Sequence, residues 1–366
     1  GAGWSATWGL QKPYPGAMLR LTSLLGLFVA ALAGAQGEPL PDLPDPLGRA
    51  GMIAAVLREA DGSEVIVAAG GSNFPDKMPW QGGQRKYHKD ILKLARKDGV
   101  WSWSKLGELP EGLVGAAFCA TPRRDALVFA GGAAADGHRA GVWRIGLDGK
   151  VTRFGPDLPR PRAYGGFTAT KGHLVILGGT DGPDATETIP TLTSLDLDAP
   201  EKTWRTTDAD ASYGRIIPLV GAGPNLLLWG GGCSLSAKDG KPFRDYHENI
   251  AFQSSLDAGN RFHGLPHALA GAAGPGVATA THLFFVGGDD GTQYGHPYET
   301  HTGLARRIFA IDLESLEVTD LGEWPHPVAV TPLLRLGDDL VTVSGEVRPG
   351  VRTPKLTRWP IPARYR

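Results

Sequence analysis

Short apolar runs that close on a pair of small residues recur along the chain. Five clear copies end in Gly-Gly and span residues 66–71, 127–132, 174–179, 226–231 and 283–288. A sixth run, LVTVSG at residues 340–345, has Ser in place of the first glycine. Runs of this length predict buried strands, and apolar patterns with the 3.6-residue period of a helix are scarce. The pattern therefore predicts an all-β chain.

The spacing of these runs predicts the architecture. The first paired positions are 70, 131, 178, 230, 287 and 344, separated by 61, 47, 52, 57 and 57 residues. A period near 50 with a strand ending in Gly-Gly is typical of kelch repeats, each forming one four-stranded blade. Glycine suits this place because the inner strand turns sharply at the crowded mouth of a propeller. We predict one six-bladed kelch-type β-propeller over residues 36–366.

Corner motifs mark the outer strands of the repeats. Leu-Pro or Trp-Pro corners lie at residues 108–110, 157–159, 264–266 and 323–325. Trp103 and Trp204 occupy the aromatic position expected to cover a blade beneath its corner.

The last repeat lacks an outer strand. After its inner strand, residues 355–361 predict a third strand, and then the chain ends. Residues 38–44 hold an orphan corner before the first repeat. We expect this segment to pair as a strand with the C-terminal blade, which would close the ring and remove two exposed sheet edges.

A leader precedes the repeats. Met18-Leu-Arg is followed by an apolar stretch at residues 21–32 and by Ala33-Gly-Ala35, the pattern of a secretory signal peptide over residues 18–35. The alternative is a membrane anchor, for which the apolar stretch is short. We expect residues 1–17 to be an extension ahead of the natural start, and the mature chain to begin near Gln36. The mature protein would then be periplasmic or secreted, without a membrane segment.

Composition narrows the classes of partner and site. The 366 residues carry a formal net charge of −1, which argues against a nucleic-acid partner because such proteins need a basic face. The two cysteines, Cys119 and Cys233, suggest small buried side chains rather than a disulfide framework. The absence of CxxC and HExxH patterns gives no indication of a zinc site, and we predict no metal or cofactor.

One copy of the repeat carries a dense run of charge. Glu346, Arg348 and Arg352 lie within seven residues after the sixth inner strand, and the five upstream copies lack these charges. A positioned carboxylate can act as general base and acid. A planar guanidinium can bind a carboxylate with two parallel hydrogen bonds. The bland alternative is a solvated charged loop at the propeller mouth.

Several segments together resemble a known family. Residues 70–75 (GGSNFP), 86–91 (KYHKDI), 161–165 (PRAYG) and 345–353 (GEVRPGVRT) are similar to segments of bacterial N-acetylneuraminate mutarotases, also called epimerases. The blades stand in a different order here, which resembles the cyclically permuted mutarotase family. A closed ring tolerates such permutation. The resemblance covers the whole propeller and implies that Glu346 and Arg352 are the catalytic pair.

Further polar residues are candidates for binding the substrate. They are Arg348, Arg162, Tyr164, Asn73, Tyr87 and Arg307. Asn73 can instead cap its own turn, and Arg162 and Tyr164 can be a surface arginine and a packing residue at the entry of an inner strand. Arg307 is included because one of Arg306 and Arg307 should face the mouth when strand side chains alternate. A second polar loop at residues 289–301 is expected to contact substrate, with an ion as the alternative ligand.

Two functions from different classes remain open. The first is an exported sugar mutarotase acting on a small acidic sugar, a sialic acid or a related ketose. The second is a non-catalytic kelch propeller that binds a glycan or protein on its loop face, since propellers host both kinds of function. A sialidase-like hydrolase is disfavoured because the chain has no Ser-x-Asp-x-Gly-x-Thr-Trp repeat.

Overall fold

A computed structural model describes residues 38–238, 241–254 and 261–366. The expected extension and signal peptide, residues 1–35, lie outside the described residues. Within the described part, no helix is both long and apolar enough to span a lipid bilayer. Cys119 and Cys233 are free and buried, as predicted.

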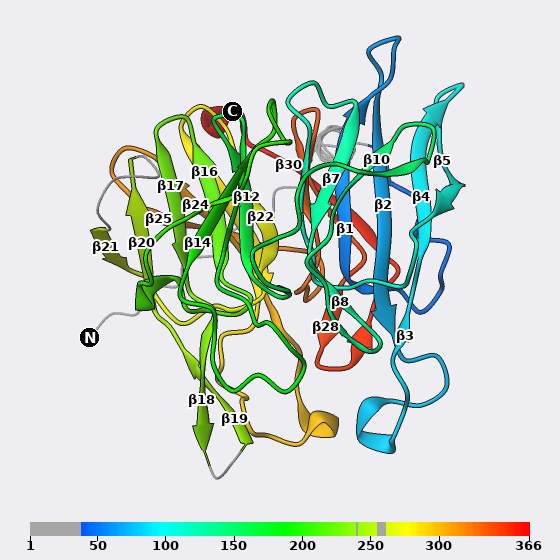
Figure 1. Cartoon of the computed structure of the whole chain (residues 1–366). Helices are drawn as coiled ribbons and strands as arrows, with labels where there is room; N and C mark the ends of the chain where they lie inside the picture. Colours follow the sequence, from blue (N-terminus) through cyan, green and yellow to red (C-terminus); the bar gives the residue numbers. More distant parts are fainter. Residues whose placement is uncertain (1–37, 239–240, 255–260) are drawn as a thin grey trace, which may run out of the picture. The chain divides into compact units, whose positions relative to one another are not determined.

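In the described part of residues 40–366, six antiparallel sheets form the blades of a propeller, and three two-stranded hairpins accompany them, which confirms the predicted fold class (Figure 1). Blade one contains β1 (Ala50–Arg58), β2 (Glu64–Asn73), β4 (Asp90–Lys97) and β5 (Val100–Glu108), with β3 (Lys86–Tyr87) paired to β2. Blade two contains β6 (Ala117–Ala120), β7 (Ala126–Ala130), β10 (Val142–Gly146) and β11 (Val151–Arg153). Blade three contains β12 (Gly166–Thr170), β13 (His173–Leu177), β14 (Leu192–Asp196) and β15 (Arg205–Thr206).

The other three blades repeat this order. Blade four contains β16 (Leu219–Gly223), β17 (Leu226–Gly230), β20 (Asn249–Gln253) and β21 (Arg261–Gly264). Blade five contains β22 (Ala273–Ala278), β23 (His282–Gly288), β24 (Ala305–Asp312) and β25 (Val318–Glu323). Blade six has three strands, β26 (Leu333–Leu336), β27 (Asp339–Val343) and β30 (Leu356–Pro360).

Small hairpins project from one end of the blades. They are β8 (Ala133–Ala134) with β9 (Gly137–His138), β18 (Cys233–Lys238) with β19 (Lys241–Tyr246), and β28 (Glu346–Arg348) with β29 (Val351–Arg352). Figure 1 shows β3, β8, β18, β19 and β28 at the same, lower end of the sheets. We call this end the loop face.

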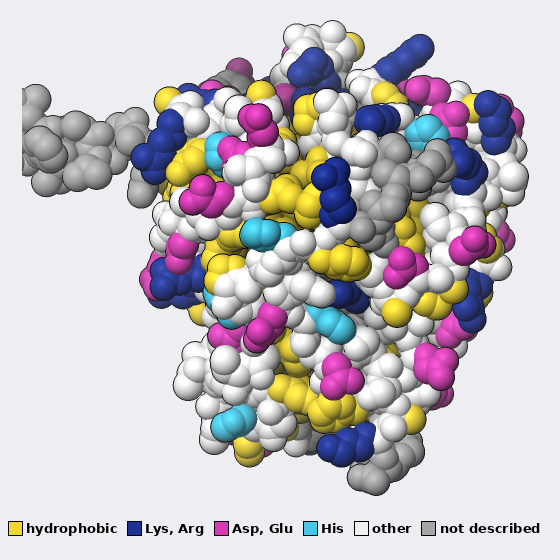
Figure 2. Space-filling model, turned by 90° about the vertical axis from the view of Figure 1, so that its left-hand side faces the viewer, with side chains coloured by type: hydrophobic (Ala, Val, Ile, Leu, Met, Phe, Trp, Pro, Cys, Tyr) yellow, Lys and Arg dark blue, Asp and Glu magenta, His cyan; other side chains and the backbone are white. Residues whose placement is uncertain are grey.

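The core consists of apolar seams between neighbouring blades. Six clusters of buried side chains fill the six junctions, including the one between blades six and one. That last junction packs Val341 and Leu356 of blade six against Val56 and Leu94 of blade one. Burial of both sheet faces explains why the inner strands are continuous apolar runs. Figure 2 shows one side of the molecule, where basic and acidic side chains are interspersed, in keeping with the near-zero net charge.

A closed ring of six main-chain hydrogen bonds surrounds the propeller axis. We call its members the axial ring: Gly51, Gly115, Tyr164, Ile217, Gly271 and Val330, one from each blade. Each N–H donates to the carbonyl of the member in the preceding blade, at 2.7–3.0 Å, and Gly51 donates to Val330. All six have positive φ, between 45° and 69°. The ring therefore ties every blade to its neighbours at the axis.

The Gly-Gly pairs also join the blades. The N–H of the second glycine donates to a carbonyl of the next blade, as Gly71 does to Leu113 at 2.8 Å. A Cβ at Gly70 would lie 2.5 Å from that same carbonyl oxygen, so a side chain there would clash. In blade four the left-handed pair is Gly231 and Gly232, one residue later than predicted, because Gly230 stays in β17.

The N-terminal segment lies on blade six, as predicted, but it is not a strand. Its Leu43 N–H donates to Pro354 O at 2.8 Å, as Leu109 and Leu158 donate to the carbonyls of Lys89 and Ala140. Leu40 and Leu43 are buried in the seam between blades six and one. The segment thus supplies the missing corner rather than the missing strand, since residues 38–49 contain no strand.

The predicted tryptophan positions cover these corners. The Trp103 indole N–H donates to Pro41 O at 3.2 Å, and the Trp204 indole N–H donates to Pro156 O at 3.0 Å. Each tryptophan thereby holds the corner of the preceding blade.

Candidate functional site

A large cavity opens on the loop face. Its volume is about 990 Å³, and loops from all six blades line it. Tyr164, Ile217, Gly271 and Val330 of the axial ring belong to its lining, so the ring forms its floor. A cavity of this size on the loop face of a rigid scaffold is the default place for a small-molecule site.

Glu346 and Arg352 face each other on the wall of this cavity. They pair across the hairpin of β28 and β29, and Arg352 Nη1 lies 3.3 Å from Glu346 Oε1. The Gly350 N–H also donates to Glu346 Oε1, at 2.6 Å. Both contacts are made by Oε1, so neither of them engages the second carboxylate oxygen, Oε2. The side chains are 17% and 6% exposed.

Arg352 reaches from blade six to blade one. Its Nε donates to Ser72 O at 3.3 Å, and its guanidinium lies 4.8 Å from the centre of the Phe74 ring. Nη1 is buried, and its 3.3 Å contact with Glu346 Oε1 is an ion pair without hydrogen-bond geometry, so within the described residues Nη1 makes no hydrogen bond. Burial lowers the pKa of Arg352 from its usual value, although the Glu346 charge opposes that shift. The group remains a cation at neutral pH, because arginine titrates far above it.

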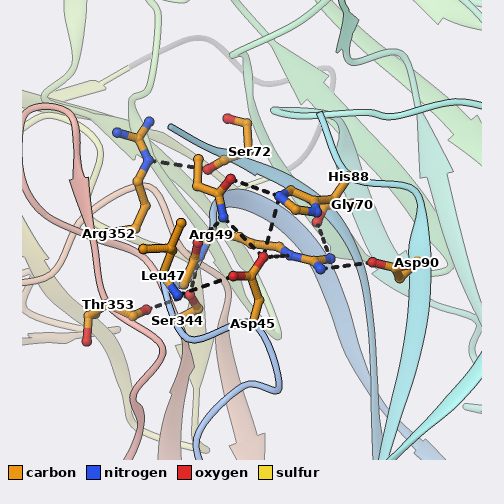
Figure 3. Close-up of polar contacts among 12 residues, drawn as sticks. Asp45, Leu47, Arg49, Gly70, Ser72, His88, Asp90, Ser344, Arg352 and Thr353 are labelled. Atoms are coloured by element: carbon orange, nitrogen blue, oxygen red, sulfur yellow. Dashed lines mark hydrogen bonds and ion pairs between the residues drawn. The ribbon is translucent and has the colours of Figure 1, made fainter. Parts of the chain in front are cut away.

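A buried polar network holds the end of β2 that Arg352 contacts (Figure 3). The Asn73 amide nitrogen donates to Asp45 Oδ2 at 3.1 Å and to Gly48 O at 2.9 Å. Asn73 Oδ1 lies 3.0 Å from His88 Nε2, so this nitrogen carries the proton. Arg49 completes the network with ion pairs to Asp45 and to a further carboxylate, Asp90.

Network contacts also cross the seam between blades six and one. The Arg49 N–H donates to Ser344 Oγ at 2.7 Å, and Ser344 Oγ donates to Thr353 O at 2.6 Å. Figure 3 shows these contacts next to the Arg352–Ser72 bond. The segment that carries Arg352 is thus held by hydrogen bonds within blade six, at Thr353, and to blade one, at Ser72.

Arg85 and Tyr164 form a second group in the cavity. The Arg85 guanidinium lies 5.6 Å from the centre of the Phe74 ring and 6.0 Å from that of Tyr87. Burial raises the pKa of Tyr164, and Arg85 opposes this shift by a direct interaction with the hydroxyl. Tyr164 is therefore a neutral hydroxyl at physiological pH, with a cation beside it.

The polar loop predicted at residues 289–301, which belongs to blade five, also lines the cavity. Asp289, Gln293, Tyr294, His296 and His301 all belong to the lining. The described residues contain no cluster of His, Cys, Asp and Glu suited to a metal ion.

A tyrosine from the neighbouring blade is tied to this loop. The Tyr246 hydroxyl donates to Asp289 Oδ2 at 2.6 Å. Burial, and then this bond to Asp289, raise the pKa of Tyr246, so it too stays protonated.

Three of the predicted site residues, Glu346, Arg352 and Tyr164, come together in the cavity. Arg162 does not line it, because its guanidinium is buried against Ile176 O and Thr191 Oγ1. Arg162 has the same blade position as Arg215, whose guanidinium donates to Gly231 O and Asn249 Oδ1. Both guanidinium groups are thus engaged by internal hydrogen bonds away from the cavity.

The other predicted binding residues also lie outside the cavity lining. Asn73 is 2% exposed within the buried network, and Tyr87 packs beside Arg85. Arg348 lies over the Trp80 ring at 5.6 Å, on the rim. Arg307 pairs with Asp320 on the exposed part of β24, so strand alternation did not bring it to the mouth.

Sequence reasoning missed Arg85, Arg244, Tyr246 and His138, which all line the cavity. Arg85 lies in the loop between two recognised segments, residues 70–75 and 86–91, and that position was an available signal. Arg244 and Tyr246 sit on β19, a hairpin without any pattern of its own.

The arrangement can bind an anion and move a proton. Two guanidinium groups, Arg85 and Arg352, lie over one aromatic ring, and one carboxylate, Glu346, stands beside them. Neutral hydroxyls from Tyr164 and Tyr246 add hydrogen-bonding groups of the kind that fix a sugar.

Comparison with known proteins supports the fold. No family model matches the sequence, and no curated protein matches it significantly. Among solved structures, YjhT is similar, with a TM-score of 0.62 and 15% sequence identity over 87% of this chain and 99% of that chain. At this level of identity, the likeness shows that the two chains share a fold.

Proposed function

We propose that the protein is a sugar mutarotase that interconverts the α and β anomers of N-acetylneuraminate or a related sialic acid. The carrying observation is the Glu346–Arg352 pair, held at 3.3 Å on the wall of a cavity of about 990 Å³. The resemblance of residues 345–353 to the mutarotase segment supports the same pair. The leader pattern further supports an exported enzyme.

The proposed reaction opens and recloses a cyclic hemiketal. The Glu346 carboxylate takes the proton of the anomeric hydroxyl, and the bond between the anomeric carbon and the ring oxygen breaks. The ring oxygen keeps the electron pair and receives a proton, so the open form is a neutral ketone and a new hydroxyl. After rotation, that hydroxyl attacks the other carbonyl face, and the protons return in the reverse order. A positioned carboxylate is worth ~10²–10⁴-fold in such transfers.

The test is exchange NMR on the anomeric signals of N-acetylneuraminate at equilibrium. We expect the wild type to accelerate exchange, and Glu346→Gln to lose about 10²–10⁴-fold of that acceleration because the amide cannot take the proton. Glu323→Gln is the matched control, since Glu323 is exposed on β25 and pairs with Arg306. Wild type that gives no acceleration would exclude this reaction for this sugar.

The second candidate function is a glycan-binding propeller without catalysis. It is favoured by the volume of the cavity and by the tyrosines that line it. Saturation-transfer signals from the sugar, combined with unchanged anomeric exchange, would identify this function instead.

A further inference from the structure

The three arginines that line the cavity, Arg85, Arg244 and Arg352, differ in whether a carboxylate of the protein already pairs with them. Arg352 has a carboxylate partner, Glu346, and a carbonyl partner, Ser72 O. Arg85 differs, because within the described residues no carboxylate lies at ion-pair distance from it. Its neighbours are instead the Phe74 ring and the Tyr87 and Tyr164 hydroxyls.

Arg85 is also accessible to a ligand. Its side chain is exposed to solvent, while the surrounding Phe74 and Tyr164 are half-buried or buried and line the same cavity. A cation that lines a cavity, and that has no carboxylate at ion-pair distance among the described residues, is arranged to meet an anion from solution.

The position of Arg85 places that anion near the proposed base. Arg85 and Arg352 both lie over the Phe74 ring, at 5.6 and 4.8 Å from its centre, and Arg352 is paired with Glu346. The two guanidinium charges also repel one another, which contributes to the lowered pKa of Arg352. Two cations beside one carboxylate leave an excess positive charge on this wall, and a bound anion would offset it.

Arg244, the third cavity arginine, lies elsewhere. It is on β19, and its main-chain N–H donates to the Tyr294 hydroxyl at 3.2 Å. Its electrostatic neighbours are Cys233, Tyr246 and Tyr294 of blades four and five. An anion bound there would lie beside Asp289, whose negative charge opposes it.

We propose that Arg85 is the residue that binds the carboxylate of the acidic sugar, leaving Arg352 to position Glu346. The inference rests on the proposed function, because a sialic acid carries its carboxylate on the anomeric carbon, next to the hydroxyl that Glu346 would deprotonate. Tyr164 and Phe74 hold the guanidinium that receives it.

The test is a binding titration that does not depend on turnover. N-acetylneuraminate and its uncharged methyl ester are titrated into wild type, Arg85→Gln and Arg85→Lys by calorimetry. We expect Arg85→Gln to bind the acid about 10–100-fold more weakly than wild type, the loss of hydrogen bonds to a charged group. Binding of the ester should not change. Arg85→Lys should recover part of the loss, because it keeps the charge without the planar fork.

Arg335→Gln is the matched control, since Arg335 is part-exposed on β26 and pairs with Asp338 outside the cavity. Equal weakening of acid and ester in Arg85→Gln would overturn the inference, as would a preference for acid that disappears in Arg244→Gln instead. Wild type that binds neither sugar would overturn it as well.

These outcomes separate the inference from the proposed reaction. If the wild type does not accelerate anomeric exchange but Arg85→Gln loses the preference for the acid, the carboxylate site is supported and the mutarotase reaction is excluded. If the wild type accelerates anomeric exchange but Arg85→Gln still prefers the acid, the reaction is supported and Arg85 is excluded as the carboxylate ligand.

Discussion

Three residues of the axial ring hold a backbone conformation that side chains disfavour. Tyr164, Ile217 and Val330 have φ of 59°, 45° and 50°, in the left-handed region. This conformation costs roughly 1–2 kcal/mol for a residue with a Cβ. The ring's hydrogen bonds hold them there, and their side chains line the cavity floor. Strain of this kind is concentrated where a function needs a side chain at a fixed place.

His88 should make stability depend on pH. Its pKa is lowered from 6.5 to about 4, chiefly by burial and then by the Arg49 charge, with Lys86 adding to the effect and Asp45 and Asp90 opposing it. The unfolded chain therefore binds a proton between these pH values that the folded chain does not. The free energy of unfolding should fall as pH drops from about 6.5 to about 4, by up to about 3 kcal/mol.

Urea unfolding at pH 7 and pH 4.5 measures this effect, with His88→Gln as the comparison. Glutamine can donate from the same position to Asn73 Oδ1 and does not titrate. The drop in stability between the two pH values should be smaller in His88→Gln. An equal drop in both proteins would mean that His88 is not the titrating group.

Sequence reasoning found the residues that are close in the chain and missed those brought together by the ring. Glu346 and Arg352 were found because a short hairpin carries both. Arg85 reaches Tyr164 from another blade, and no local spacing indicates that contact. Arg162 was a candidate because it lies in the PRAYG segment and because a guanidinium can bind a carboxylate, whereas its guanidinium bonds Ile176 O and Thr191 Oγ1.

At the scale of the strand, Ser344 performs the task that glycine performs in the other five blades. It ends β27 with φ of 62°, and its hydroxyl bonds both Arg49 N–H and Thr353 O. The side chain is fully buried. The degenerate sixth copy is therefore a specialised version of the same turn, placed at the seam between blades six and one.

Ser344→Ala should destabilise the protein more than Ser344→Gly. Alanine keeps the unfavourable φ and loses both hydrogen bonds, leaving a buried N–H without its acceptor, at about 1–3 kcal/mol. Glycine loses the same bonds but relieves roughly 1 kcal/mol of backbone strain. Denaturant unfolding of both variants gives the order. A glycine variant less stable than the alanine variant would show that backbone strain is not significant at this turn.

Repeat elements were predictable where a simple rule governs them. Inner strands, corners and blade number followed from apolar runs and Gly-Gly spacing, because each blade solves the same packing problem. The one-residue shift to Gly231 and Gly232 was not predictable, since three consecutive glycines satisfy the pattern in two registers. The N-terminal segment had the sequence of a corner, and only the corner formed.

For the whole ring, closure takes place in blade six, where no continuous chain joins the N-terminal corner to the C-terminal strand β30. Leu43 is 3% exposed there, packed with Leu356 and Val341. Leu43→Ala should lower the free energy of unfolding by about 2–5 kcal/mol, the usual loss for a buried leucine. The control is Leu47→Ala, in the same segment but 43% exposed, which should change stability by less than about 0.5 kcal/mol. Equal effects in thermal or urea unfolding would contradict the role of this corner in closing the ring.

The proposed site lies across the seam between blades six and one. Glu346 belongs to the last blade, and Phe74, Arg85 and the Ser72 carbonyl belong to the first. A ligand held between Glu346 and Arg85 would link the last blade to the first. Occupancy would then lower the frequency with which these two blades separate, so that an abundant ligand would protect the protein from proteolysis at this junction.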